Sequence, residues 1–171
     1  SIMGINGAVG VDRMDVETYK RLVSMAPTTE IRPAMSMIWE IRSIKDPHEV
    51  SAIREACRIS DRAMMVASDV LSPGITENEV KSEIVSEIYR QLCERPAFDV
   101  MVASADRSSL PHGPLQRAGE RDRVLSNGDI VVIDLGVVVE GYCSDITRTF
   151  VIGKPKDSEF ESVYLSVLSA K

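Results

Sequence analysis

The feature that most restricts the fold is a pair of β-branched runs near the C-terminus, joined by Glu140-Gly141. A Glu-Gly pair between two such runs is typical of a two-residue hairpin turn. The turn predicts an antiparallel hairpin that occupies roughly 129–139 and 142–152. In that register Asp134 faces Thr147, and a slip of one residue would move every side chain to the other face.

Two aspartates lie inside this hairpin. Asp145 precedes Thr147 by two residues, so the register puts Asp134 and Asp145 on one face as diagonal neighbours, roughly 7–8 Å apart at the backbone. Two close carboxylates repel each other, and a divalent cation with a preference for oxygen ligands removes that conflict. Thr147 and Thr149 share the face and are candidates to hydrogen-bond the ligands. Spacing alone leaves open the alternative that both aspartates cap turns or face water.

Apolar residues on both faces of the hairpin weigh against that alternative. One face carries Val131, Ile133, Leu135, Val137 and Val139, and the other carries Ile130, Val132 and Val138. A hairpin that is apolar on both faces is expected to be covered on both. Its aspartates then need a partner, because an unpaired buried charge is costly.

His112 is the second candidate for chemistry. It lies in the run Leu-Pro-His-Gly-Pro, where the prolines and the glycine restrict the backbone. A rigid loop that presents an imidazole suits a proton donor or a partner for an oxyanion. An incidental turn histidine is the alternative, and a single sequence does not decide between them.

The rest of the chain predicts helices that are segregated from the strands. A capped helix begins at Asp46-Pro47, a capping box at Thr76–Glu79 opens a second, a strand follows over 98–103, and a last helix starts at 158–161. The first helix carries a stripe of Val50, Ile53, Cys57, Ser60, Met64, Ala67 and Leu71, and the second carries Val80, Ile84, Val85, Ile88 and Leu92. This order predicts an α+β fold, an antiparallel sheet with helices packed on it. Residues 1–43 predict a strand over 2–5, a helix opened by Asp15 and a second short helix over 33–43.

Composition excludes several classes of protein. The 171 residues carry a net charge of −6 and no basic patch, which argues against a nucleic-acid partner. No apolar run approaches the roughly 18 residues of a membrane helix. The three cysteines are far apart and form no Cys-x-x-Cys pair, which favours small buried thiols in a reducing compartment and hence a cytoplasmic location.

These motifs together resemble the pita-bread metallopeptidases, a family that includes Xaa-Pro dipeptidase, aminopeptidase P and methionine aminopeptidase. The resemblance is carried by the runs at 41–49, 111–113, 128–129, 133–136 and 141–150. It is nearest to the Xaa-Pro branch and implies that 1–43 ends an N-terminal creatinase-like domain. It also implies that 44–171 is the N-terminal half of the catalytic pita-bread domain.

The resemblance implies a site as well as a fold. Two divalent ions, Mn²⁺ first and Co²⁺ or Zn²⁺ as alternatives, would be held in part by Asp134 and Asp145. They would activate a shared water for hydrolysis of the peptide bond before proline. His112 matches the family's histidine near the scissile bond, and the implied substrate is a small peptide with proline at its second position. A homodimer is also expected.

One departure from the family pattern bears on activity. The family's metal-binding histidine and two glutamates belong to a second half-domain, and no histidine follows His112 here. We therefore expect this chain to be an incomplete portion of a longer enzyme. Two other readings stay open: a metal-independent, creatinase-like C–N hydrolase on the same scaffold, and a non-catalytic module that binds peptides or partners.

Overall fold

The computed structural model describes residues 7–113, 122–156 and 159–170 of the chain. The chain divides into two compact units, Ser1–Pro47 and His48–Lys171, and each is described by itself. Among the described residues, no helix is both long enough and apolar enough to cross a membrane.

The first unit is a small β-α-β arrangement followed by a helix. The strands β1 (Ala8–Val11) and β2 (Glu30–Pro33) pair in parallel, and α1 (Val16–Met25) connects them. The predicted helix cap is confirmed, because Asp15 Oδ1 accepts the backbone N–H of Thr18 at 2.8 Å. The helix predicted over 33–43 is α2 (Met35–Ser43), which begins two residues later because Pro33 belongs to β2. The strand predicted over 2–5 lies outside the described residues.

Two long helices open the second unit. They are α3 (Pro47–Val70) and α4 (Glu77–Arg90), and both begin where the sequence predicts. The predicted capping box of α4 is confirmed: Thr76 Oγ1 accepts the Glu79 N–H at 3.2 Å, and Glu79 Oε2 accepts the Thr76 N–H at 2.8 Å.

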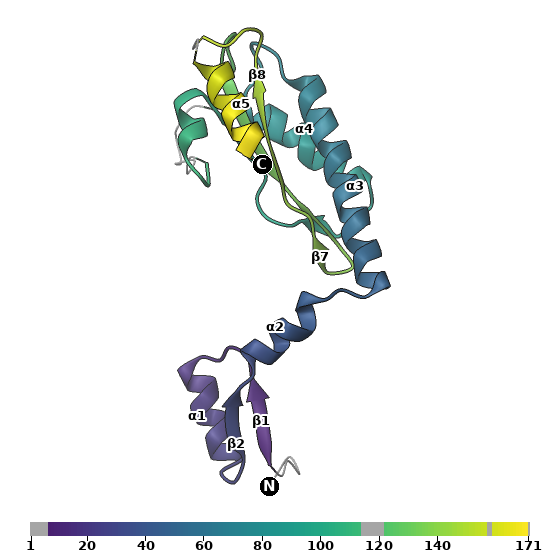
Figure 1. The fold of residues 1–171 in the computed structure, drawn as a ribbon, viewed down its shortest axis with the longest axis vertical. Helices are drawn as coiled ribbons and strands as arrows, with labels where there is room; N and C mark the ends of the chain where they lie inside the picture. The colour runs from purple at the N-terminus through teal and green to yellow at the C-terminus, as the bar shows by residue number, and fades with distance from the viewer. Residues whose placement is uncertain (1–6, 114–121, 157–158, 171) are drawn as a thin grey trace. The chain divides into compact units, whose positions relative to one another are not determined.

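The strands of the second unit form two antiparallel sheets that share the predicted hairpin (Figure 1). The elements are β3 (Arg95–Pro96), β4 (Met101–Ser104), β5 (Ile130–Leu135), β6 (Val137–Val139), β7 (Tyr142–Cys143) and β8 (Ile146–Val151). One sheet has the order β4-β5-β8 and the other β3-β6-β7. The predicted register is confirmed, because Asp134 is opposite Thr147 and Val139 is opposite Tyr142.

The core lies between the helices α3 and α4 and one face of β5. Val131, Ile133 and Leu135 are fully buried there, with Val80, Ile84 and Ile88 of α4 as predicted. The stripe predicted for α3 is partly wrong. Ser60, Met64 and Ala67 are buried as predicted, but Val50 and Cys57 are exposed, and the buried face also includes Ala52, Ala56, Ile59 and Ala63. Short alanine side chains let a helix approach its neighbours closely, and a search for large apolar residues does not detect them. Leu92 is also misplaced, because it follows the end of α4 and is 92% exposed.

The last helix, α5 (Phe160–Ala170), lies against the opposite face of β8 (Figure 1). Its side chains Phe160, Val163, Tyr164, Val167 and Leu168 line a groove with Thr147 and Thr149. This second face is covered only in part, because no residue of α5 is buried, so the predicted cover is confirmed only for the face toward α3 and α4. This α+β arrangement confirms the predicted fold class.

Candidate metal centre

The turn at the end of the hairpin fixes the position of every candidate ligand on it. Glu140 has a φ of +50° and Gly141 a φ of +79°. Positive φ at both central residues is the pattern of a type I′ turn, whose twist matches that of the flanking strands. Glu94 Oε1 accepts the Gly141 N–H at 3.0 Å and supports the turn from outside the hairpin.

One row of residues crosses the three-stranded sheet at Asp134. Met101 of β4 and Thr147 of β8 are the direct partners of Asp134 on its two sides. Thr147 Oγ1 donates a hydrogen bond of 2.6 Å to Asp134 Oδ1, so the two side chains share a face and meet. The bond orients the carboxylate and uses one of its two oxygens, which leaves Oδ2 for a cation. Thr149 is opposite Val132, two residues further along the same face.

Asp145 lies between β7 and β8, at the point where the hairpin bends. Continuing the register puts this exposed residue opposite Gly136, which separates β5 from β6. A Cβ atom on Gly136 would collide with the carbonyl oxygen of Ser144 and would lie 2.9 Å from Cε1 of Phe98. The two strands therefore approach each other closely next to Asp145, and that approach requires glycine.

His112 lies in a tight turn above the same row. The Gly113 N–H donates to Leu110 O at 3.0 Å, and a Cβ atom on Gly113 would be 2.7 Å from Cγ of Met101. The turn thus presses against Met101, the direct neighbour of Asp134 on the sheet. His112 itself is exposed. The structure brings the predicted histidine to the sheet strand that adjoins the predicted metal ligand.

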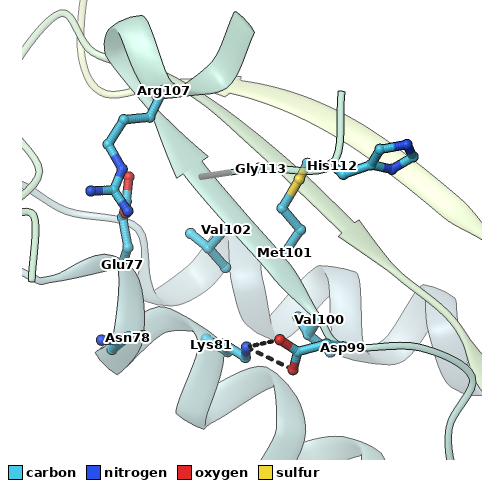
Figure 2. A pocket seen from close by; sticks show the side chains of 10 residues that line it. All are labelled: Glu77, Asn78, Lys81, Asp99, Val100, Met101, Val102, Arg107, His112 and Gly113. Carbon is cyan, nitrogen blue, oxygen red and sulfur yellow. Dashed lines mark hydrogen bonds and ion pairs between the residues drawn. The ribbon is translucent and has the colours of Figure 1, made fainter. Parts of the chain in front are cut away.

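A cavity of about 320 Å³ lies beside this turn (Figure 2). His112, Gly113 and Met101 line one part of it, and Lys81 and Asp99 pair across another part with an Nζ–Oδ1 distance of 2.7 Å. Glu77 and Arg107 lie together at its other end. The walls thus combine a methionine side chain with charged groups and an imidazole, a combination that suits a small polar ligand with an apolar portion.

A buried ionic network connects to the cavity through Glu77, and it was not predicted from the sequence. Asp129 is 2% exposed, and its carboxylate accepts hydrogen bonds from Arg123 Nη1 at 2.8 Å and Lys156 Nζ at 3.0 Å. The hydrogen bond from Arg123 is the main cause that lowers the pKa of Asp129 to about 2, against the opposing effect of burial. Arg123 Nη1 also donates to Ser104 Oγ at 2.8 Å, and Ser104 in turn donates to Glu77. The sequence feature that could have indicated this network is Asp129, an acidic residue directly before the buried strand β5.

The described donor set suits a hard cation but is incomplete. Carboxylate oxygens are the ligands that Mg²⁺ and Mn²⁺ prefer, and Asp134 already has the hydrogen-bonded neighbour that commonly orients a metal ligand. Within the described ranges, no group of three or more histidine, cysteine, aspartate or glutamate residues is arranged to hold a metal ion. The described residues therefore offer candidate ligands but no complete ligand set.

Comparison with known proteins gives a consistent result. Residues 51–171 match the sequence model of metallopeptidase family M24. The Xaa-Pro dipeptidase of Pyrococcus furiosus is 36% identical over 169 residues, which is 99% of this chain and 45% of that protein. The crystal structure of the prolidase from Pyrococcus horikoshii OT3 superposes with a TM-score of 0.87 at 35% identity, over 98% of this chain and 46% of that one. X-Pro aminopeptidase from Thermotoga maritima gives a TM-score of 0.82 at 32% identity, with 96% and 46% coverage. The chain spans less than half the length of these proteins.

Proposed function

The chain belongs to metallopeptidase family M24, and we propose that it forms part of an enzyme that hydrolyses the peptide bond before proline in Xaa-Pro peptides. The observation that carries the proposal is the row of Met101, Asp134 and Thr147 across the sheet. In this row the Asp134 carboxylate, oriented by Thr147, lies beside β4, the strand that the turn containing His112 contacts. The named activities of the dipeptidase and aminopeptidase relatives support the choice of substrate.

Asp134 and Thr147 of this row, together with Asp145 and His112, have defined tasks in this proposal. Asp134 and Asp145 would hold divalent ions, and Thr147 keeps the Asp134 carboxylate in one orientation through its 2.6 Å hydrogen bond. The chemistry that such ions supply when bound is Lewis acidity, which activates water and polarises the peptide carbonyl. His112 donates a hydrogen bond to the carbonyl oxygen as negative charge develops on it. We assign part of the peptide to the cavity beside His112.

We propose two ions per site, with Mn²⁺ as the first choice and Co²⁺ or Zn²⁺ as alternatives. Two carboxylates with water suit Mn²⁺ because it is the hardest of the three cations. Retention of both Asp134 and Asp145 favours this reaction over a metal-independent one on the same scaffold, in which the carboxylates would have no cation to hold.

We propose that the remaining ligands come from outside these 171 residues. The relatives are more than twice as long as this chain, and the described residues supply only part of a ligand set. In this view 1–43 ends an N-terminal creatinase-like domain and 44–171 is the first half of the catalytic domain. The cytoplasm is the proposed location, since Cys57, Cys93 and Cys143 are all free thiols. The expectation that these thiols are buried is wrong for Cys57 and Cys143, which are exposed.

The test uses the complete protein that contains this chain. We expect it to hydrolyse an Xaa-Pro dipeptide after addition of Mn²⁺ or Co²⁺ and to lose activity in EDTA. Asp145→Asn keeps the side-chain volume but removes the charge, so we expect turnover to fall by roughly 10³-fold or more when a metal ligand is lost. Asp69→Asn, an exposed aspartate on α3, is the matched control and should leave turnover unchanged.

Two results would contradict this function. Hydrolysis that persists in chelator at the rate seen with metal would exclude the metal-dependent reaction. Peptide binding by calorimetry that is independent of metal, without turnover in the complete protein, would support a binding module instead.

A further inference from the structure

We propose that Glu77 is a positioning residue: its buried carboxylate anchors the segment that carries His112 and thereby fixes the imidazole over the sheet. Glu77 is the first residue of α4 and lies at the opposite end of the cavity from His112 (Figure 2). It is 2% exposed although it carries a charge. A buried carboxylate needs specific partners, and in the described part of the chain those of Glu77 are Ser104 and Arg107, at the start of the segment 104–123 that carries His112.

The first contact is at the start of that segment. Glu77 Oε1 accepts the backbone N–H of Ser104 at 2.8 Å and the Ser104 hydroxyl at 2.7 Å. Ser104 is the last residue of β4 and is fully buried. The next residue, Ala105, has a φ of +51°, so the chain turns sharply at this point. Two charge-assisted hydrogen bonds therefore hold the residue from which the segment leaves the sheet.

The second contact is at the end of the segment. Arg123 Nη1 donates to Ser104 Oγ at 2.8 Å, so the hydroxyl that donates to Glu77 accepts from Arg123. The backbone adds to this closure, because Arg123 O accepts the Glu77 N–H at 3.0 Å. The Glu77 N–H, which has no acceptor within its own helix, is thus satisfied by Arg123. The two ends of the segment meet at Glu77.

The third contact reaches toward His112. Arg107 Nη2 lies 3.2 Å from Glu77 Oε2, an ion pair in which neither Glu77 Oε2 nor Arg107 Nε makes a hydrogen bond within the described residues. Two backbone hydrogen bonds connect Arg107 to the turn that contains His112. The Leu110 N–H donates to Arg107 O at 3.3 Å, and the Gly113 N–H donates to Leu110 O at 3.0 Å. This short chain of contacts connects the carboxylate to the turn that presents His112.

The role of Glu77 follows from this arrangement. Removing its charge leaves Arg107 and Ser104 with a weaker acceptor and loosens the segment at its base, without touching Asp134 or Asp145. The anchoring is a property of this chain alone, while its effect on catalysis rests on the proposed function. The two parts can be tested separately.

The structural arm measures amide hydrogen exchange in the 171-residue chain. In Glu77→Gln we expect the Ser104 and Gly113 amides to exchange about 10-fold faster or more, because a buried charge-assisted bond is weakened. The amides of Ile84 and Ile88 in α4 should not change. Glu83→Gln, which neutralises an exposed glutamate on the same helix, is the matched control and should exchange like the original chain. If Glu77→Gln fails to fold, Ser104→Ala removes the hydroxyl link and keeps the carboxylate.

The catalytic arm is a double-mutant cycle on turnover in the complete protein. Glu77→Gln should lower kcat about 10-fold with little change in the metal concentration that gives half activity. In a His112→Ala background the same substitution should have almost no further effect, because Glu77 acts through His112.

The outcomes separate this inference from the proposed function. Unchanged exchange at Ser104 and Gly113 in both Glu77→Gln and Ser104→Ala would overturn the anchoring role. Equal loss of kcat with and without His112 would overturn the positioning role. If the complete protein shows no peptidase activity, the proposed function fails, and the exchange experiment alone decides whether Glu77 anchors the segment.

Discussion

The carboxylates near the sheet differ in the kind of side chain that each is paired with. Asp129, Glu77 and Glu87 are all buried, and each is paired with at least one arginine. Asp134 is half-buried and hydrogen-bonded to a threonine, with no ion pair among the described residues. The structural carboxylates thus have cationic partners in place, whereas Asp134 has a neutral one. This difference is the residue-scale reason to assign an external cation to Asp134.

The lowered pKa of Asp129 predicts how the free energy of unfolding depends on pH. Its pKa is lowered to about 2 in the folded chain, mainly by the hydrogen bond from Arg123, while an unfolded aspartate titrates near 3.8. Its contribution is therefore fully present above about pH 4 and is lost as the pH falls toward 2. The size is about 2 kcal/mol of the free energy of unfolding. Urea unfolding of the 171-residue chain and of Asp129→Asn at a series of pH values measures this.

The control for that series is an aspartate without a buried partner. Asp69→Asn should give the same pH dependence as the unsubstituted chain, since Asp69 is exposed. In Asp129→Asn, the free energy of unfolding should change less between pH 5 and pH 2.5 than it does in the unsubstituted chain. A variant that retains the full difference would show that the ion pair to Arg123 does not stabilise the fold.

Thr147 predicts a measurable effect on metal affinity. Thr147→Val removes the hydroxyl that donates to Asp134 Oδ1 but keeps the β-branched shape that suits a strand. Loss of such a supporting bond typically weakens metal binding by about 10- to 100-fold. Mn²⁺ titration followed by calorimetry or paramagnetic resonance in the complete protein measures the change. Thr149→Val, two residues further along the same face, is the control and should have a smaller effect. Equal affinity in all three proteins would count against Asp134 as a ligand.

At the scale of elements, local signals in the sequence were enough to predict the hairpin. A Glu-Gly pair between β-branched runs determines both the turn and the register, and the register alone predicts that Asp134 and Thr147 meet. The capping box at Thr76–Glu79 likewise predicts where α4 begins. Such features depend on residues within a few positions of each other, so one sequence contains all the information they need.

Features that depend on distant residues were not predictable in the same way. Four of the seven buried residues of α3 are alanines, and which side of that helix faces the sheet is decided by the close approach of the two elements. The network joins Glu77 to Ser104, 27 positions later, and Ser104 to Arg123, 19 positions later. The parallel pairing of β1 with β2 was missed for the same reason. In such cases one sequence does not show which distant residues will be in contact, because the folded chain decides it.

Two glycines of the hairpin give a matched test of this geometry. Gly136→Ala puts a methyl group against the Ser144 carbonyl and the Phe98 ring, so the strands must separate beside Asp145. We expect a loss of about 3 kcal/mol in the free energy of unfolding, as for an overpacked core. Gly141→Ala adds the same atoms in open space and introduces strain only through its φ of +79°, with an expected loss of about 1 kcal/mol. Chemical denaturation of both variants measures the difference. Similar losses would mean that the close approach at Gly136 relaxes at little cost.

At the scale of the whole molecule, the two faces of the hairpin sheet differ in how completely they are covered. The face toward α3 and α4 contains the fully buried residues of the core. The other face is covered in part by α5, whose apolar side chains remain largely exposed. Val163 is 58% exposed, Leu165 53%, Val167 67% and Leu168 56%. A helix this apolar and this exposed marks a surface that other protein normally covers. The length of the relatives makes the rest of the same protein the first candidate to cover it.

The exposed side of α5 predicts that the 171-residue chain associates with itself when it is studied alone. Covering one valine side chain contributes roughly 1.5–3 kcal/mol, so Val167→Asp should weaken the association by about 10-fold or more. Ser169→Asp adds the same charge to the same helix at an exposed polar position and is the matched control. Analytical ultracentrifugation over a concentration series measures the dissociation constants of the three chains. We expect the unsubstituted chain and Ser169→Asp to form dimers at the same concentration. Monomers at every concentration would show that the apolar side of α5 does not drive association between copies. If the second half of the catalytic domain that we propose covers α5, Val167 should be buried and protected from surface labelling in the complete protein.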